Sequence, residues 1–177
     1  RAGLARRHSM GYTEDMQGKV LVVDDDALVR ATVERVLSRA GFDVSAVAGG
    51  AEAQEALQAA PYDVAVVDLY MPRMDGFEML QWMQAHAPGV VPVAFSGTSR
   101  VEDALRAVQR GAFDFVAKPV ESTEDLVQHI SRAVEHKRLR ENNERLLGEL
   151  ERKNAELTHR LQQLELAHSV LQSQAVA

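Results

Sequence analysis

The sequence predicts an α/β fold with a doubly wound parallel sheet, followed by a long C-terminal helix. From residue 19 to about residue 120, short apolar runs alternate with amphipathic segments of helical period. Strict alternation of this kind implies parallel strands covered by helices on both faces. From residue 122 to about residue 172 the chain contains no proline and a single glycine, Gly148. This composition is typical of one uninterrupted helix.

Five runs of mostly apolar residues have the length and composition of buried strands. They are Val20–Val23, Val44–Val47, Val64–Val67, Val91–Phe95 and Phe113–Ala117. The segments between them place apolar residues three and four positions apart, and Gly41 and Gly111 follow two of these segments where left-handed caps end helices. The pattern predicts a flavodoxin-like doubly wound five-stranded parallel sheet over residues 19–135, with right-handed crossovers.

The composition narrows the classes of function. The absence of cysteine excludes disulfides, thiolate metal sites and cysteine nucleophiles from this sequence, and it fits a cytoplasmic protein. The formal net charge is −6, whereas broad binding to nucleic acid needs a basic surface. We therefore expect no direct nucleic-acid binding by this chain. No apolar stretch is long enough to span a bilayer, and we expect no membrane partner.

Residues 1–18 differ from the rest of the chain. They include Arg1, Arg6 and Arg7, early glycines and no apolar period. We interpret them as a flexible N-terminal arm, part of which can be a remnant of cloning. A basic docking arm is the functional alternative.

Residues 136–177 are predicted to continue the fifth helix of the domain as a coiled-coil helix. Apolar positions here alternate by three and four residues, which is the a/d pattern of a coiled coil. The a and d residues are Leu147, Leu150, Asn154, Leu157, Leu161, Leu164, His168 and Leu171. Asn154 falls at an a position, where one buried asparagine favours a parallel two-stranded coil in fixed register. We therefore predict a homodimer; a single solvated amphipathic helix is the alternative.

Polar side chains stand where the predicted strands end. Asp24 and Asp25 follow the first strand and Asp68 follows the third, whereas Ser96 and Lys118 end the fourth and fifth. Since open α/β sheets bind ligands at the carboxyl edge of their strands, we expect these five side chains to converge. The carboxylates offer oxygen ligands for Mg²⁺, and the hydroxyl and the lysine suit a phosphoryl group.

Asp68 is the best candidate for a nucleophile, because a carboxylate can attack phosphorus and hold the phosphoryl group as an acyl phosphate. Ser96 would donate a hydrogen bond to a phosphoryl oxygen, and Lys118 would supply positive charge. Asp26 extends the acidic run, but we interpret it as a helix N-cap or first-turn residue and not as a ligand. Taken singly, each of the three has a plainer interpretation: Asp68 as a loop acid, Ser96 as a helix cap and Lys118 as a surface lysine. Their order on successive strand ends favours the joint site.

Four motifs carry a resemblance to a known family. They are Val22-Val23-Asp24-Asp25, Asp68-x-Tyr70-Met71-Pro72-x-Met74-Asp75-Gly76, Ser96-Gly97 and Lys118-Pro119. Together they resemble the receiver domain of two-component response regulators, over residues 19–135. The resemblance implies that a histidine kinase or a phosphotransfer protein donates a phosphoryl group to Asp68.

The resemblance also implies roles for the neighbouring residues. It implies Mg²⁺ ligands at Asp24, Asp25, Asp68 and the backbone carbonyl of Tyr70. It further implies that Ser96 and Phe115 form a switch pair, in which the serine moves toward the phosphoryl group and the ring of Phe115 follows inward. Tyr70 is bulky for a position two residues beyond the acceptor, and we expect it to shield the phosphoryl group and alter its rate of hydrolysis.

The sequence thus predicts a phosphorylation-controlled receiver that transmits its state to a dimeric coiled-coil stalk. The alternative is a regulatory fragment of a larger enzyme, such as a cyclic-di-GMP phosphodiesterase, a diguanylate cyclase or a serine phosphatase, whose output domain is absent here. In either case this chain itself would catalyse only its own phosphorylation. A haloacid-dehalogenase-like phosphatase also uses an aspartate nucleophile, but it expects an Asp-x-Asp pair where this chain has Asp24-Asp25.

Overall fold

The computed structural model describes residues 18–98, 100–119 and 122–175. The chain divides into two compact units, the first ending at Lys137 and the second beginning at Arg138. The division falls two residues beyond the boundary expected between residues 135 and 136. The expected N-terminal arm, residues 1–18, lies outside the described residues except for Gly18.

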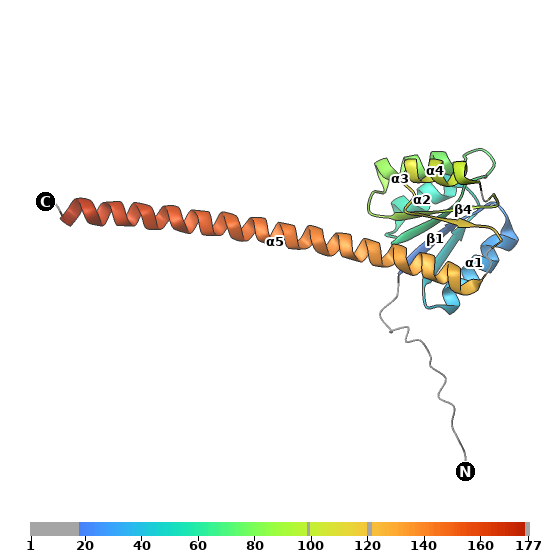
Figure 1. Ribbon diagram of the computed structural model, residues 1–177, viewed down its shortest axis with the longest axis horizontal. Helices are drawn as coiled ribbons and strands as arrows, with labels where there is room; N and C mark the ends of the chain where they lie inside the picture. The colour runs from blue at the N-terminus through green and yellow to red at the C-terminus, as the bar shows by residue number, and fades with distance from the viewer. Residues whose placement is uncertain (1–17, 99, 120–121, 176–177) are drawn as a thin grey trace, which may run out of the picture. The chain divides into compact units, whose positions relative to one another are not determined.

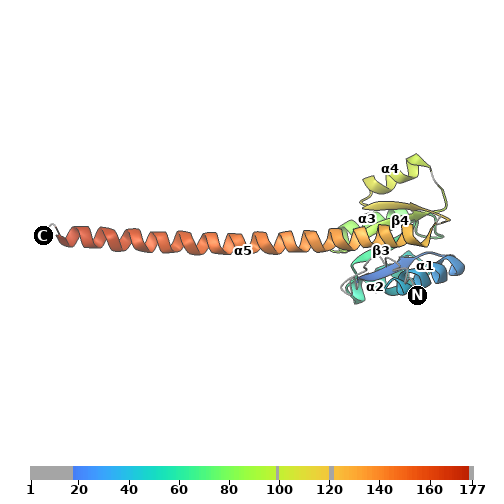
Figure 2. The same ribbon diagram turned by 60° about the horizontal axis from the view of Figure 1, so that its bottom comes forward.

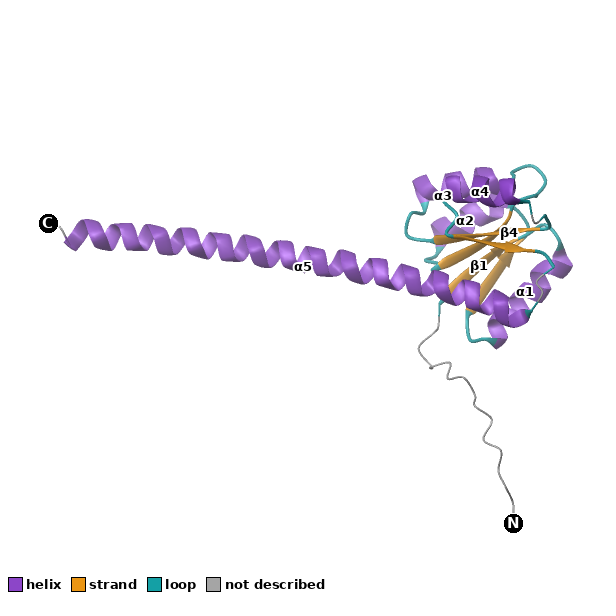
Figure 3. Cartoon of the chain, viewed as in Figure 1, coloured by secondary structure: helices purple, strands orange, loops and turns teal. Residues whose placement is uncertain are grey.

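The first unit contains one five-stranded sheet, and all of its pairings are parallel. The strands are β1 (Lys19–Val23), β2 (Asp43–Val47), β3 (Val64–Asp68), β4 (Val91–Ser96) and β5 (Asp114–Ala117). Their spatial order is β2-β1-β3-β4-β5, with β3 in the centre. Figure 3 shows the strands in orange, with β1 and β4 labelled. The predicted strands are confirmed, with ends shifted by one residue at most.

Helices cover both faces of this sheet, as predicted for a doubly wound fold (Figure 1). They are α1 (Ala27–Arg39), α2 (Gly50–Ala59), α3 (Gly76–His86), α4 (Val101–Gln109) and α5 (Thr123–Ala175). In Figure 1, α1 and the start of α5 lie on one face of the sheet, and α2, α3 and α4 lie on the other. Figure 2 shows α4 and α1 on opposite sides of the domain. The flavodoxin-like fold class is therefore confirmed.

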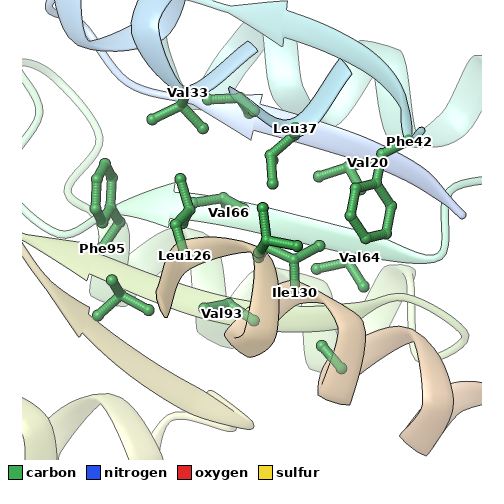
Figure 4. Packing of buried hydrophobic residues seen from close by; sticks show 14 of the residues in the cluster. Val20, Val33, Leu37, Phe42, Val64, Val66, Val93, Phe95, Leu126 and Ile130 are labelled. Atoms are coloured by element: carbon green, nitrogen blue, oxygen red, sulfur yellow. The ribbon is translucent and has the colours of Figure 1, made fainter. Parts of the chain in front are cut away.

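The core follows the alternation of side chains along each strand. Val64 and Val66 of β3 pack with α1 and α5, where Leu126 and Ile130 are buried (Figure 4). The alternate residues of β3, beginning with Ala65, pack with α2 and α3 on the other face. Because both faces are covered, β3 is buried along its whole length, which explains its continuous run of apolar residues.

Local signals explain where two of the helices begin and end. The Asp26 carboxylate caps α1 by accepting the backbone N–H groups of Leu28 at 2.8 Å and Val29 at 3.2 Å. This confirms the N-cap predicted for Asp26. Gly41 and Gly111 both have φ of +94°, a conformation that favours glycine, and they follow α1 and α4 as expected.

Not every apolar residue at helical spacing is buried. Leu28 of α1 is 77% exposed, and α4 turns Val101, Leu105 and Val108 outward. Ala107 is instead the fully buried residue of α4. The periodicity thus predicts a helix correctly at both places, but it does not identify the side of α4 that packs on the domain.

The second unit is formed by the later part of α5, which continues to Ala175. Its leucines at the predicted a and d positions are 56–66% exposed in the single chain. Ion pairs with a spacing of four residues also support the helix, as between Arg145 and Glu149 and between Arg160 and Glu156. Among the described helices, none combines the length and apolar character required to cross a membrane.

Candidate functional site

The candidate site lies at the carboxyl edge of the sheet, where four parallel strands deliver one or two polar residues each. Asp24 and Asp25 follow β1, and Asp68 is the last residue of β3. Ser96 is the last residue of β4, and Lys118 directly follows β5. The peptide bond between Lys118 and Pro119 is cis. The strands are in parallel register, so these ends lie at the same edge.

Three carboxylates gather at this edge. Asp24, Asp25 and Asp68 each offer an oxygen atom, and these atoms lie within 4.8 Å of one another. Asp24 and Asp68 are buried, at 1% and 6% exposure, whereas Asp25 is exposed. The site therefore has two fixed buried carboxylates and one that reaches it from solvent.

Backbone N–H groups hold the two buried carboxylates in place. Oδ1 of Asp24 accepts the N–H of Asp26 at 2.9 Å, and Oδ1 of Asp68 accepts the N–H of Tyr70 at 3.3 Å. The carbonyl of Asp24 in turn accepts a hydrogen bond from Nη1 of Arg30 at 2.6 Å. Each carboxylate thus keeps its Oδ2 atom for the interior of the site.

Lys118 occupies that interior. Its Nζ atom lies 2.6 Å from Oδ2 of Asp24 and 3.0 Å from Oδ2 of Asp68. The same ammonium lies 4.8 Å from the centre of the Phe95 ring. Lys118 therefore joins two carboxylates that are 44 residues apart in the chain, and it is not the surface lysine of the plainer interpretation.

Burial raises the pKa of the Asp68 carboxyl above its ordinary value of 3.8. The hydrogen bond and positive charge of Lys118 act in the opposite direction, as does the N–H of Tyr70, whereas the negative charge of Asp24 raises this pKa further. Desolvation is the larger influence. A carboxylate in these surroundings gains from any additional cation that approaches it.

The turn between Asp68 and α3 is built for close approach. A Cβ atom on Gly76 would lie 2.1 Å from the Asp68 carbonyl oxygen and 2.6 Å from Cα of Leu69. The N–H of Gly76 donates to the Leu69 carbonyl at 3.0 Å, and Asp75 caps α3 in a capping box with Glu78. Only glycine fits here, so the Asp75-Gly76 pair fixes how the chain leaves Asp68.

Ser96 is fully buried, and its hydroxyl is engaged within its own loop. Ser96 Oγ accepts the N–H of Thr98 at 3.2 Å and lies 3.4 Å from Oγ1 of Thr98. The plainer interpretation of Ser96 as the cap of the following helix is wrong, because the N-cap of α4 is Arg100.

Phe115 is half-buried beside Leu69, Phe77 and Ala94, on the face covered by α3 and α4. Phe113 stacks instead on the ring of His136 of α5, with ring centres 4.6 Å apart. The two phenylalanines therefore face opposite sides, as their alternation predicts. The roles of Ser96 and Phe115 as a switch pair and of the Tyr70 carbonyl as a metal ligand stay predictions.

Sequence reasoning did not identify Asp103 of α4 as part of this neighbourhood. Asp103 accepts a hydrogen bond from the Tyr70 hydroxyl at 2.8 Å and another from the Thr98 hydroxyl. It is 8% exposed, unlike its neighbour Glu102 in the same helical turn. Acids are common in the first turn of a helix, so the sequence offers no signal that separates Asp103 from Glu102.

Comparison with known families matches residues 20–131 to the response regulator receiver domain. The chain belongs to this family. It is 36% identical over 120 residues to the DNA-binding transcriptional regulator NtrC of Escherichia coli strain K12, covering 68% of this chain and 25% of that protein. The C4-dicarboxylate transport transcriptional regulatory protein DctD of Rhizobium meliloti is also 36% identical over 120 residues, covering 68% of this chain and 26% of the relative.

The receiver match corresponds to only part of these relatives, since the chain spans about a quarter of their length. Among solved structures, NtrX from Brucella abortus superimposes with a TM-score of 0.71 and 28% identity, covering 74% of this chain and 30% of that one. The receiver domain of the Francisella response regulator 1452 gives a TM-score of 0.64 and 25% identity, covering 68% and 98%. The chain is therefore a receiver domain of a two-component response regulator with a helical extension.

Proposed function

We propose that Asp68 is the phosphoacceptor of this receiver and that a histidine kinase or a phosphotransfer protein is its phosphodonor. The observation that carries the proposal is the contact of Lys118 Nζ with both Asp24 and Asp68 at the carboxyl edge of the sheet. An ammonium fixed between two carboxylates can neutralise the oxygens of a phosphoryl group as it arrives.

The proposed reaction is a direct displacement at phosphorus. A carboxylate oxygen of Asp68 forms a bond to phosphorus while the phosphorus–nitrogen bond to the donor histidine breaks, and the imidazole leaves and takes up a proton. Asp68 is suited to this role because its Oδ1 is held by the Tyr70 N–H, so its Oδ2 points toward Lys118. The reaction needs Asp68 to be ionised, and Lys118 favours that form.

The donor set of Asp24, Asp25 and Asp68 fits Mg²⁺, which prefers oxygen ligands and retains several waters. The three carboxylates would hold the ion together with the Tyr70 carbonyl, and the ion would neutralise charge on the phosphoryl oxygens. The raised pKa of Asp68 supports this assignment, because a group destabilised by burial and by a neighbouring carboxylate gains from a divalent cation.

We further propose that phosphorylation is read through Ser96 and Phe115. Ser96 Oγ would exchange its contacts with Thr98 for a phosphoryl oxygen, and the half-buried Phe115 ring would move inward. Phe115 packs against Ala107 and Ala112, which flank the end of α4. A movement of the ring would therefore change the surface formed by α4 and β5.

The output that the chain itself supports best is a parallel coiled-coil homodimer. Six leucines at the a and d positions are 56–66% exposed in the single chain. They are Leu147, Leu150, Leu157, Leu161, Leu164 and Leu171. A second copy would bury this stripe, and Asn154 at an a position would fix the register. Because α5 is continuous from the receiver through the stripe, a change at its start can alter the pairing of the two helices.

The full-length activity is a separate proposal. NtrC and DctD are named as transcriptional regulators, and the chain corresponds to about a quarter of each. A catalytic output, such as a cyclic-di-GMP phosphodiesterase, a diguanylate cyclase or a serine phosphatase, is the second candidate, since a dimeric stalk also suits such domains. The complete coding sequence of the gene would distinguish these outputs.

Acetyl phosphate with Mg²⁺ tests the phosphoacceptor. The acyl phosphate is reduced with borohydride, and the modified residue is mapped by mass spectrometry. We expect the modification at Asp68, its loss in D68N and its persistence in the matched control D26N, which changes the helix cap. Modification at Asp24, as a haloacid-dehalogenase-like chemistry requires, would contradict the proposal.

A further inference from the structure

A relay of hydrogen bonds links the phosphoacceptor loop to the first turn of α4. Tyr70, two residues beyond Asp68, donates its hydroxyl to Oδ1 of Asp103 at 2.8 Å. Thr98, two residues beyond Ser96, donates its hydroxyl to Oδ2 of the same carboxylate. One carboxylate therefore holds the loop after β3 and the loop after β4 together.

The relay continues to the buried serine. The N–H of Thr98 donates to Ser96 Oγ at 3.2 Å, and the two hydroxyl oxygens are 3.4 Å apart. A hydroxyl has one proton to donate. Ser96 therefore cannot follow a phosphoryl group on Asp68 unless it changes its contacts with Thr98, and Asp103 holds Thr98 in place.

The charges of the relay are set by its own contacts. The hydrogen bonds from Thr98 and then Tyr70 lower the pKa of the Asp103 carboxyl, so that it accepts as a carboxylate at neutral pH. The hydrogen bond to Asp103 raises the pKa of the Tyr70 hydroxyl, which therefore keeps its proton. Hydrogen bonds to a charged acceptor are among the stronger ones in proteins.

Packing fixes the tyrosine from the other side. The Tyr70 ring meets the Phe77 ring edge to face, with centres 6.2 Å apart, and the Arg106 guanidinium lies 4.0 Å from the centre of Phe77. Tyr70 is 51% exposed, so its hydroxyl would otherwise bond to water. Side chains of both α3 and α4 therefore hold the Tyr70 ring in the position from which its hydroxyl bonds to Asp103.

We propose that Asp103 is a positioning residue that latches Thr98, and through it Ser96, to Tyr70 in the unphosphorylated receiver. The inference rests on the proposed phosphorylation of Asp68. The latch stabilises the resting arrangement, so part of the free energy of phosphoryl binding is spent in opening it. Breaking the latch therefore favours the state in which Ser96 contacts the phosphoryl group.

The test is the affinity of the full chain for fluoroberyllate with saturating Mg²⁺, measured by titration calorimetry. D103A removes the shared acceptor, Y70F removes one donor and leaves the ring, and E102A is the matched control in the same turn of α4. We expect D103A and Y70F to bind fluoroberyllate about three- to tenfold more tightly than the natural sequence, and E102A to bind it equally well. D103N, which keeps one accepting oxygen, should fall between D103A and the natural sequence.

The double variant Y70F/D103A should bind no more tightly than D103A alone, because both changes open the same latch. If D103A does not fold, Y70F, which keeps the helix and its charge, decides the question. Unchanged or weaker binding in Y70F and D103A overturns the latch while leaving the phosphoacceptor intact. No binding of fluoroberyllate by the natural sequence overturns the proposed function itself.

Discussion

The carboxyl edge of the receiver sheet and the stripe of leucines on α5 differ in the kind of side chain they hold and in where its partners lie. At the sheet edge, charged groups are buried, and every one of Asp24, Asp68 and Lys118 finds a partner within the chain. Along residues 138–175, leucines lie at helical spacing, and the described part of the chain leaves them 47–68% exposed. The charged groups of the first region have their partners within the single chain, whereas the proposed coiled coil would supply a partner for the second.

Under the proposed function, this difference separates the site that would be phosphorylated from the helix that would carry the output. Buried charges need fixed geometry, since an unpaired ion in the interior is strongly destabilising. Leucines at the a and d positions can change their packing with little change in free energy while Asn154 keeps the proposed register, because each arrangement buries the same kind of surface. The proposed switch would combine a site of fixed geometry with a leucine stripe whose packing can change. The helix α5 is continuous between them.

The largest expected effect contrasts two glycines. G76A would place a Cβ atom against the backbone of Asp68 and Leu69, and we expect a loss of about 3 kcal/mol in the free energy of unfolding. G148A meets nothing within 4 Å and removes a flexible residue from a helix, so it should gain up to about 1 kcal/mol. Urea unfolding of the two variants measures both. Equal effects would show that the two regions are not packed as differently as the structure indicates.

The second prediction concerns the seam, by which we mean the leucine stripe at the a and d positions of α5. L157A removes a leucine from a d position, whereas L166A removes one from an f position of similar exposure. We expect L157A to weaken dimerisation about a hundredfold, since each dimer loses two buried leucines, and L166A to leave it nearly unchanged. Sedimentation equilibrium gives both dissociation constants. If L166A is as damaging as L157A, the seam does not follow the predicted heptads.

The third prediction uses the raised pKa of Asp68. A folded-state pKa above the ordinary 3.8 means that the folded protein binds this proton more tightly than the unfolded chain. Ionised Asp68 therefore destabilises the fold at neutral pH, and this effect disappears as pH falls below the ordinary value. We expect D68N to raise the Tm by about 3 °C at pH 7 in the presence of a chelator.

The same gain should shrink as the pH falls, and it should reverse when Mg²⁺ is added in excess, because the natural carboxylate then binds the ion. Calorimetric scans of both proteins, from pH 7 down to below the ordinary pKa value of 3.8, provide the measurement. A destabilised D68N in chelator at pH 7 would mean that the contact with Lys118 outweighs the burial of Asp68.

The sequence predicts the charged site well because strand ends are easily recognised. Apolar runs that end in Asp24, Asp68, Ser96 and Lys118 leave little freedom in a parallel sheet, and the structure brings the acids and the lysine together. The helix cap at Asp26 is also predicted, since it follows from local chain geometry.

Contacts made at a distance are harder to predict. The acids in the first turn of α4 look alike in the sequence, and only the packing of the helix selects Asp103 to meet Tyr70, 33 residues away. The apolar stripe of α4 likewise reveals a helix without showing that Leu105 points outward. In both cases the orientation of α4 on the sheet decides, and helical periodicity does not contain that information.

The most direct test joins the two regions. The chain has no cysteine, so R152C at an f position gives each dimer a single pair of spin labels on α5. We expect the distance distribution between the labels to change when fluoroberyllate and Mg²⁺ are added, and to stay constant in the same protein carrying D68N. Identical distributions with and without fluoroberyllate, in a dimer shown to bind it, would contradict the proposal that Asp68 controls the stalk.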